Sequence, residues 1–296
     1  MKSAFAGYHP VINFLYFTFV FICSMFFMHP ICLAISIISG VTYSIVLNGK
    51  KALRFNLIYL LPMMLIAMLV NPAFNHEGAT ILVYLSSGNP ITLESIAFGI
   101  AAAVMLAAVV SWFSCYNVIM TSDKFIYLFG RVIPALSLIL SMVLRFIPKF
   151  KAQIKVISNA QKCVGRDVSN GSILQRAKHG IKILSIMVTW SLENAIETAD
   201  SMKTRGYGLP GRTAFSIYRF DKRDKKALLV IGSMGLYVII GAIVGGVYFR
   251  YFPSMKSVSL SPFSVTVFAA YFILCIYPII IERQEDRKWK QLKSKI

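Results

Sequence analysis

The chain has 296 residues, of which 57% are hydrophobic and only 15% are charged. Soluble domains carry roughly 25% charged residues, and here the charges gather in blocks separated by long windows that contain none. This pattern excludes an ordinary soluble protein and indicates a chain that crosses the membrane several times.

The net charge of +19 raises the alternative of nucleic-acid binding. In a membrane protein a basic excess is better explained by cytoplasmic Lys and Arg and by contact with anionic lipid heads. No nucleic-acid partner is therefore expected. The five cysteines have no C-x-x-C spacing, which favours packing over a metal or redox site, and no cofactor is expected.

Six segments are apolar enough to cross a bilayer, which takes about 17–25 residues: 11–28, 31–47, 55–70, 95–120, 227–249 and 262–281. The third segment contains Pro62 and is the marginal one. None of the six has an acidic or basic residue in its interior, which argues against an ion- or proton-coupled carrier. The first segment lacks a small-x-small cleavage site, so it is interpreted as a span and not as a signal peptide.

Basic residues orient these spans, because Lys and Arg favour cytoplasmic loops. The loop after the second span holds Lys50, Lys51 and Arg54, whereas 71–93 holds neither Lys nor Arg. The sequence therefore predicts a multi-pass protein of the cell membrane with both termini in the cytoplasm. The expected external loop 250–261 departs from the rule, since it carries Arg250 and Lys256.

These observations predict an all-α polytopic membrane protein with four parts. Residues 1–123 form an N-terminal membrane domain of four spans, and 124–225 form a cytoplasmic coupling domain of amphipathic helices. A transmembrane hairpin at 226–281 and a basic cytoplasmic tail at 282–296 follow. Segment 132–144 is apolar but short and contains Pro134, so 124–147 is predicted to lie at the membrane surface.

Two long helices are predicted within the coupling domain. The first starts after Pro148 and ends near Gly165. The second starts at Ser172, where S-x-x-Q forms a capping box, and ends at Arg205 and Gly206, since Gly is common just past a helix end. Its apolar residues recur every three or four positions for about 30 residues, and this stripe comprises Leu174, Ala177, Ile181, Leu184, Val188, Leu192, Ala195, Ala199 and Met202.

The stretch KTRGYGLPGRT (203–213) contains a literal G-x-G-x-x-G at Gly206, Gly208 and Gly211. A dinucleotide site needs these glycines at the start of a helix, where N–H groups meet the phosphate. Here they follow a helix end, which carries partial negative charge. The match is therefore interpreted as accidental, and no G-x-x-x-x-G-K-[ST] occurs in the chain.

Both predicted helices end on a similar tripeptide. The first reads Gly165, Arg166, Asp167 and the second reads Thr204, Arg205, Gly206. Each Arg alone is explained by simple capping, because a cation near a helix C-terminus is stabilised by the dipole. Two such ends on long, partly apolar helices suggest arms that present Arg to a soluble partner.

The residues resemble the transmembrane T component of energy-coupling factor (ECF) transporters. The similarity runs from about His29-Pro30 to Arg223, and its motifs are Gly88-Asn-Pro-Ile-Thr-Leu-Glu94, Leu144-Arg-Phe-Ile-Pro148, Asn159-Ala-Gln-Lys162, Met202-Lys-Thr-Arg-Gly-Tyr-Gly208 and Arg212-Thr213. Each motif is weak alone, and their order and spacing together are fairly specific.

The resemblance implies a non-enzymatic coupling subunit of an ATP-driven importer for a vitamin or transition-metal ion. Its partners would be two cytoplasmic ABC-type ATPases, which receive Arg166 and Arg205, and a substrate-capturing S component, which the membrane and coupling helices hold. The first motif departs from the family pattern, because Asp167 stands where Gly is common, and Asp167 is expected to compete for Arg166.

Two rival functions stay open. A permease that carries its own solute would need a polar, solute-sized cavity among the spans. A membrane-embedded enzyme would need clustered acids, His or Ser, and its candidates are His29, His76, Glu77 and Glu94, which form no metal-ligand spacing.

Overall fold

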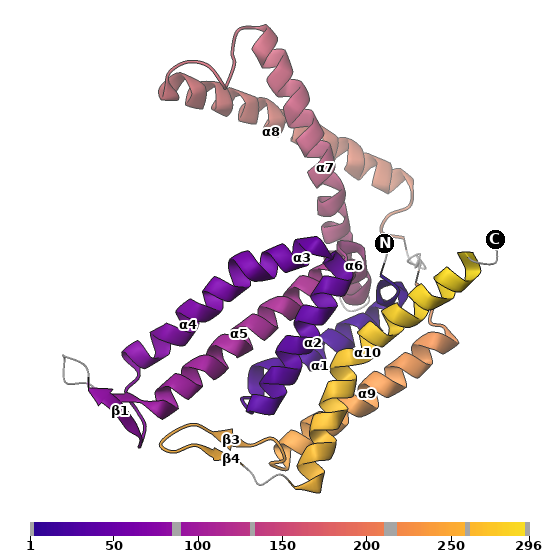
Figure 1. The fold of residues 1–296 in the computed structure, drawn as a ribbon. Helices are drawn as coiled ribbons and strands as arrows, with labels where there is room; N and C mark the ends of the chain where they lie inside the picture. The colour runs from indigo at the N-terminus through magenta and orange to yellow at the C-terminus, as the bar shows by residue number, and fades with distance from the viewer. Residues whose placement is uncertain (1–2, 85–89, 131–133, 210–217, 258–260, 294–296) are drawn as a thin grey trace. The chain divides into compact units, whose positions relative to one another are not determined.

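The computed structural model describes residues 3–84, 90–130, 134–209, 218–257 and 261–293 (Figure 1). The chain divides into two compact units, each described here by itself. The membrane unit comprises Met1–Phe125 with Tyr218–Ile296, and the helical-pair unit comprises Ile126–Ile217. The predicted all-α fold is confirmed, since the strands described form only two short antiparallel hairpins.

The membrane unit holds most of the elements: η1 (Phe5–Gly7), α1 (Pro10–Phe26), α2 (Pro30–Asn48), α3 (Lys50–Phe55), η2 (Asn56–Leu60), α4 (Leu61–Phe74), β1 (Ile81–Tyr84), β2 (Pro90–Thr92), α5 (Leu93–Ile119), α9 (Lys222–Ile243), β3 (Phe249–Arg250), β4 (Lys256–Ser257) and α10 (Pro262–Lys293). Helix α6 (Ser122–Gly130) crosses the boundary between the units, and α7 (Pro134–Cys163) and α8 (Ile173–Thr204) form the helical pair. Within the described residues, five helical segments can span a membrane and α1 is a shorter apolar helix of 17 residues.

The first two helices start in the same way, from a His-Pro pair. The imidazoles of His9 and His29 accept hydrogen bonds from the backbone N–H groups of Val11 and Ile31, at 3.4 and 3.2 Å. The proline that follows each His takes the first helical position, where a missing N–H costs nothing. The turn predicted at His29-Pro30 is thus a capped helix start.

Helices α1, α2, α5, α9 and α10 pack around a shared core, and α4 lies along α5 (Figure 1). Small residues allow close approach between membrane helices. A Cβ built on Gly40 would lie 3.2 Å from the Trp112 indole nitrogen, and one on Gly235 would lie 2.6 Å from the Phe19 ring. These glycines set how closely α2 meets α5 and α9 meets α1.

Hydrogen bonds to hydroxyl groups link four helices inside this core, namely α1, α2, α5 and α10. The side chains of Ser24 and Ser36 are 2.7 Å apart, the Trp112 indole N–H donates to Ser36 at 3.1 Å, and the hydroxyl of Tyr271 lies 3.3 Å from Ser24. Between membrane helices such bonds contribute stability because a lipid environment offers no water to replace them.

The third predicted span is longer in the structure than in the sequence analysis. One helical segment runs over Lys50–Phe74, with the π-helical turn Asn56–Leu60 directly before Leu61 and Pro62. Proline lacks an N–H and crowds the preceding turn, and a π-turn widens the backbone at that point. The helix therefore continues past Pro62.

Two boundaries differ from the sequence prediction. Helix α7 begins at Pro134 and keeps Pro148 in its interior, so the predicted start after Pro148 is wrong. The ring of Phe150, just past Pro148, stacks on Phe146 and packs on Trp190 of α8, and this packing offsets the lost hydrogen bond. Helix α10 likewise continues to Lys293, through the segment predicted as a separate tail.

Four charged side chains fasten the N-terminal segment, and we call them the N-terminal clamp: Lys124, Arg223, Asp224 and Glu282. Glu282 accepts bonds from the Ser3 hydroxyl and from the N–H groups of Ala4 (2.9 Å) and Phe5 (3.3 Å). Lys124 donates to the carbonyls of Ala6 (2.5 Å) and Ile119 (3.0 Å), Arg223 donates to the Gly7 carbonyl (3.2 Å), and Asp224 accepts from the N–H of His9 (3.3 Å).

Candidate functional site

Helices α7 and α8 cross near their middles (Figure 1). An apolar cluster fixes the crossing: Ile157 of α7 and Ile183 and Met187 of α8 are buried there. The rings of Phe150 and Trp190 meet edge-on with centroids 5.7 Å apart. The ammonium group of Lys149 lies 5.3 Å from the centre of the Trp190 ring and donates to the Asn194 side chain.

The first Arg-bearing end follows α7, whose last residue is Cys163. Gly165 has φ +78°, its N–H donates to the Lys162 carbonyl at 3.0 Å, and the N–H of Arg166 donates to the Gln161 carbonyl at 2.9 Å. This pair of bonds is the Schellman arrangement, which satisfies carbonyls that a helix end would leave unpaired. The side chain of Arg166 is exposed.

The second end, after α8, has the same backbone pattern with Arg in a different place. Gly206 has φ +75°, its N–H donates to the Lys203 carbonyl at 3.0 Å, and the N–H of Tyr207 donates to the Met202 carbonyl at 3.0 Å. Arg205 therefore precedes the left-handed glycine, whereas Arg166 follows its own. Arg205 is also exposed.

Asp167 is held by its own loop. Its carboxylate lies 3.4 Å from the Lys162 ammonium group and accepts from the Ser169 N–H at 3.0 Å. The hydrogen bond from Ser169, followed by the nearby Lys162 charge, lowers the pKa of Asp167 to about 2. The ion pair of Asp167 is thus with Lys162, and across the described residues Arg166 makes no ion pair.

The predicted stripe of α8 faces away from α7. Within the single chain Leu174, Ile181 and Leu184 are 82%, 68% and 62% exposed. The other members are exposed as well, except for half-buried Met202. The residues that pack on α7 belong to a second stripe that the sequence analysis missed, namely Ile183, Met187 and Trp190. They also recur at three- and four-residue steps, so the signal was present.

The two Arg residues lie at nearly equal distances along the chain from the crossing. Arg166 comes sixteen residues after Phe150, and Arg205 comes fifteen residues after Trp190. At ~1.5 Å of helix per residue, each Arg lies about 22–24 Å beyond the contact between these rings. The helical pair therefore presents two exposed guanidinium groups on arms of similar reach.

The glycines of the stretch 203–213 lie where the sequence analysis placed them, after a helix. Gly206 and Gly208 have φ +75° and +96°, while Gly211, Arg212 and Thr213 lie outside the described residues. Within the described part of this stretch, the N–H groups of Gly206 and Tyr207 donate to the helix and so are not free to bind a phosphate.

Two of the candidates for an enzymatic site, His29 and Glu94, have structural roles. His29 caps α2, and the Glu94 carboxylate accepts from the hydroxyl of Thr80 at 2.9 Å and from its N–H at 3.2 Å. The part of the chain that the structure describes contains no group of three or more His, Cys, Asp or Glu residues placed to hold a metal ion.

Comparison with known proteins assigns the chain to a protein family. The model of CbiQ, described as cobalt transport protein, matches residues 3–215. The chain belongs to this family. The sequence-based resemblance to a T component is confirmed, because curated relatives of this CbiQ-family chain are named energy-coupling factor transporter transmembrane protein EcfT.

Three of these relatives give the extent of the similarity. The one from Lactobacillus helveticus (strain DPC 4571) is 35% identical over 98 residues, which cover 33% of this chain and 35% of the relative. The one from Lactococcus lactis subsp. cremoris (strain MG1363) is 36% identical over 106 residues, which cover 36% of this chain and 40% of the relative. The one from Staphylococcus aureus (strain 04-02981) is 27% identical over 250 residues, which cover 76% of this chain and 88% of the relative. The matches thus span well under half of the first two relatives. Helices α9 and α10 lie beyond the family match.

Proposed function

We propose that this CbiQ-family chain is the transmembrane coupling subunit of an ATP-driven ECF-type importer. In this role it joins two cytoplasmic ABC-type ATPases to a substrate-binding S component in the membrane. The imported substrate is a vitamin or a transition-metal ion, and the chain itself performs no catalysis. Its N- and C-termini then lie in the cytoplasm, as the distribution of Lys and Arg predicts.

One observation carries the proposal: both helix ends are capped by their own backbone. The carbonyls of Gln161 and Lys162, and those of Met202 and Lys203, accept from the N–H groups that follow. The guanidinium groups of Arg166 and Arg205 are therefore not needed as caps, and both are exposed. This favours docking to a partner over the simple capping explanation.

The chemistry of Arg suits the contact. Its planar guanidinium makes several directed hydrogen bonds and keeps its charge at every physiological pH. The packed crossing of α7 and α8 gives the stiffness that coupling requires, because a displacement of one Arg moves the whole helix. Two arms of about equal reach suit two similar ATPase subunits.

The exposed stripe of α8 supplies the second contact. Leu174, Ile181, Leu184, Val188 and Leu192 are each at least half exposed in the single chain. An apolar face of this length is typical of an interaction surface. We assign it to packing in the assembly with the S component.

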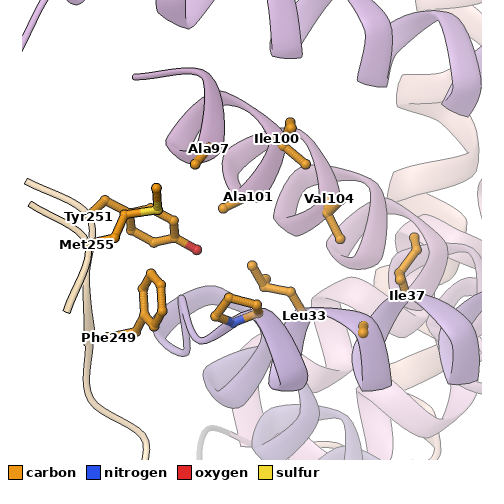
Figure 2. A pocket seen from close by; sticks show the side chains of 11 residues that line it. Leu33, Ile37, Ala97, Ile100, Ala101, Val104, Phe249, Tyr251 and Met255 are labelled. Carbon is orange, nitrogen blue, oxygen red and sulfur yellow. The ribbon is translucent and has the colours of Figure 1, made fainter. Parts of the chain in front are cut away.

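The rival permease function needs a polar cavity within the spans. The pocket between α2, α5 and β3–β4 is lined by apolar side chains, which does not suit a vitamin or a hydrated ion. This pocket, whose lining Figure 2 shows, therefore gives the permease function no support.

The test is co-purification of the ATPases and uptake by the complete transporter carrying Arg166→Ala, Arg205→Ala or both. Truncating one partner of a buried, hydrogen-bonded charge pair costs about 2–5 kcal/mol. This corresponds to roughly 30- to several-thousand-fold in affinity. We expect the double variant to lose the ATPases, and Arg205→Ala to be worse than Arg166→Ala, because the chain turns away at the left-handed Gly206 directly after Arg205.

A matched control is Lys178→Ala with Lys182→Ala, which removes two charges from exposed positions on α8. This control should retain the ATPases, and all variants should reach the membrane in normal amounts. Full ATPase binding and uptake by the double Arg variant would show that the two ends are ordinary helix termini.

A further inference from the structure

The helical pair joins the membrane unit through two covalent connections. The chain enters the helical-pair unit between Phe125 and Ile126, within α6, and leaves it between Ile217 and Tyr218. In the coupling role proposed above, a displacement of the pair reaches the membrane unit along these connections. A connection that flexes takes up the displacement, so the side chains that fix each connection decide how much of it is passed on.

The first connection is fixed by Lys124, which lies two residues before Ile126. Its ammonium group donates to the carbonyl of Ala6 at 2.5 Å and to that of Ile119 at 3.0 Å. The side chain is buried, and a buried cation is strongly destabilised when it loses its hydrogen-bond partners. Lys124 therefore holds the start of α6 to the N-terminal segment.

The second connection is fixed by His9. Its imidazole ring meets the rings of Tyr218 and Phe220 edge-on, with centroids 6.4 and 5.1 Å away. Its backbone N–H donates to the Asp224 carboxylate at 3.3 Å. Because Tyr218 is the first residue of the membrane unit after the pair, these contacts begin directly where the chain returns.

Arg223 adds a contact beside His9. Its guanidinium group lies 4.3 Å from the centre of the Tyr8 ring, within the range of a cation–π contact, and donates to the Gly7 carbonyl at 3.2 Å. Both connections are thus fastened to four consecutive residues, 6–9, which we call the connection anchor.

The connection anchor is itself held on both sides. Phe5, directly before it, is fully buried, and its ring packs on Tyr8 and on Tyr16 of α1. Pro10, directly after it, starts α1 with His9 as the cap. Since α1 belongs to the shared core of the membrane unit, a force on either connection is passed to the helix bundle and not to a free chain end.

We propose that the connection anchor transmits movement of the helical pair to the membrane unit, with His9, Lys124 and Arg223 as positioning residues. The inference rests on the proposed coupling function. Because one short segment holds both connections, the two move together, and the work done by the ATPases on the pair is not lost in separate flexing of α6 and of the returning chain.

Two substitutions release the second connection while they keep the fold of α1 and α9. His9→Asn retains a good N-cap for α1, whereas the ring contacts with Tyr218 and Phe220 are lost. Arg223→Met retains an apolar stem over Tyr8 and removes the charge that the cation–π contact and the hydrogen bond require.

Each substitution has a matched control. His29→Asn makes the same change at the cap of α2, where the imidazole ring packs on Phe249 and Phe268. Lys225→Met removes an exposed cation from the same turn of α9 as Arg223. Both controls should behave like the wild type in the measurements that follow.

The first measurement is amide hydrogen exchange on the full chain in lipid vesicles. Loss of one aromatic contact should speed exchange in residues 218–224 by roughly 5-fold, and the double variant His9→Asn with Arg223→Met should exceed either single variant. Unchanged exchange in the double variant would overturn the inference, and this measurement needs no partner protein.

The second measurement is the ratio of uptake to ATP hydrolysis in the complete transporter, with the radiolabelled substrate of the S component used. We expect the double variant to retain its ATPases and its ATP hydrolysis while uptake per ATP falls. A variant that is only less stable loses hydrolysis and uptake in proportion, so a constant ratio would overturn the proposal, as would loss of the ATPases. Failure of the coupling role itself gives a different result, since the wild-type chain would then recruit no ATPases.

Discussion

Lys124 is a buried cation of the N-terminal clamp, only 5% exposed. In the described residues no carboxylate lies within ion-pair distance of it, and its ammonium group is satisfied by the carbonyls of Ala6 and Ile119. Burial penalises the charged form and lowers the pKa of Lys124 from 10.5 to about 8. The folded protein therefore releases this proton more easily than the unfolded chain does.

A pH dependence of stability follows from this pKa. Between pH 8 and 10.5 the unfolded chain binds more protons at Lys124 than the folded chain, so stability rises with pH across this window. Below pH 8 Lys124 is protonated in both the folded and the unfolded state, so burial of its charge lowers the free energy of unfolding by the full amount. Thermal unfolding of the wild type and of Lys124→Met, measured from pH 7 to 10.5, should show the difference in Tm moving in favour of the wild type. Parallel profiles would contradict the assignment.

For single residues, the sequence predicts backbone conformation better than it predicts which side chains contact each other. The glycines at 165 and 206 were expected to end helices, because only Gly adopts a positive φ without strain, and both do so. The partner of Asp167 could not be predicted, since Lys162 and Arg166 are both nearby in sequence and only the path of the loop decides between them.

Helix α8 carries two apolar faces, of which one packs on α7 and the other is exposed in the single chain. Met187 is buried against α7, whereas Leu184, three residues earlier, is 62% exposed. Met187→Asp should destabilise the helical pair by about 2–5 kcal/mol, because it removes apolar packing and buries an unpaired carboxylate. Amide hydrogen exchange across α7 and α8 in the full chain should rise accordingly.

Leu184→Asp is the matched comparison on the same helix. It should leave exchange in α7 and α8 unchanged while reducing co-purification of the assembly, because its side chain points away from α7 and lies on the face proposed to pack in the assembly. An intact assembly with Leu184→Asp would show that this face contacts only lipid heads.

Periodicity predicted α8 almost to the residue, including the capping box at Ser172 and Gln175. It could not choose between the two faces, because both have apolar residues at helical spacing. Nor could it show that α7 continues through Pro148. A proline in a helix costs about 3 kcal/mol, so its presence in the interior depends on tertiary packing that no local pattern records.

The N-terminal segment of the membrane unit joins three of its helices. Residues 3–9 contact Glu282 of α10, Arg223 and Asp224 of α9 and Lys124 of α6. From the sequence, these four charges were predicted to lie in a coupling domain or a tail, since charged residues between apolar segments usually belong to loops. Their joint contact with one short segment results from the packing of the whole unit.

Substitutions of Glu282 test whether the N-terminal clamp joins these helices. Its carboxylate accepts from three donors of the N-terminal segment, among them the buried N–H of Phe5. Glu282→Ala leaves the two N–H groups unpaired, at about 1–3 kcal/mol for each buried one, whereas Glu282→Gln retains an acceptor and should cost less. Asp286→Ala, an exposed acid one turn further along α10, serves as the control.

We expect Glu282→Ala to lower Tm and to raise hydrogen exchange in residues 3–9. Because the same segment binds Lys124 and Asp224, exchange should also rise at the start of α9 and in α6. A change confined to Ser3, Ala4 and Phe5 would show that the four contacts act independently, and no clamp would then join the three helices.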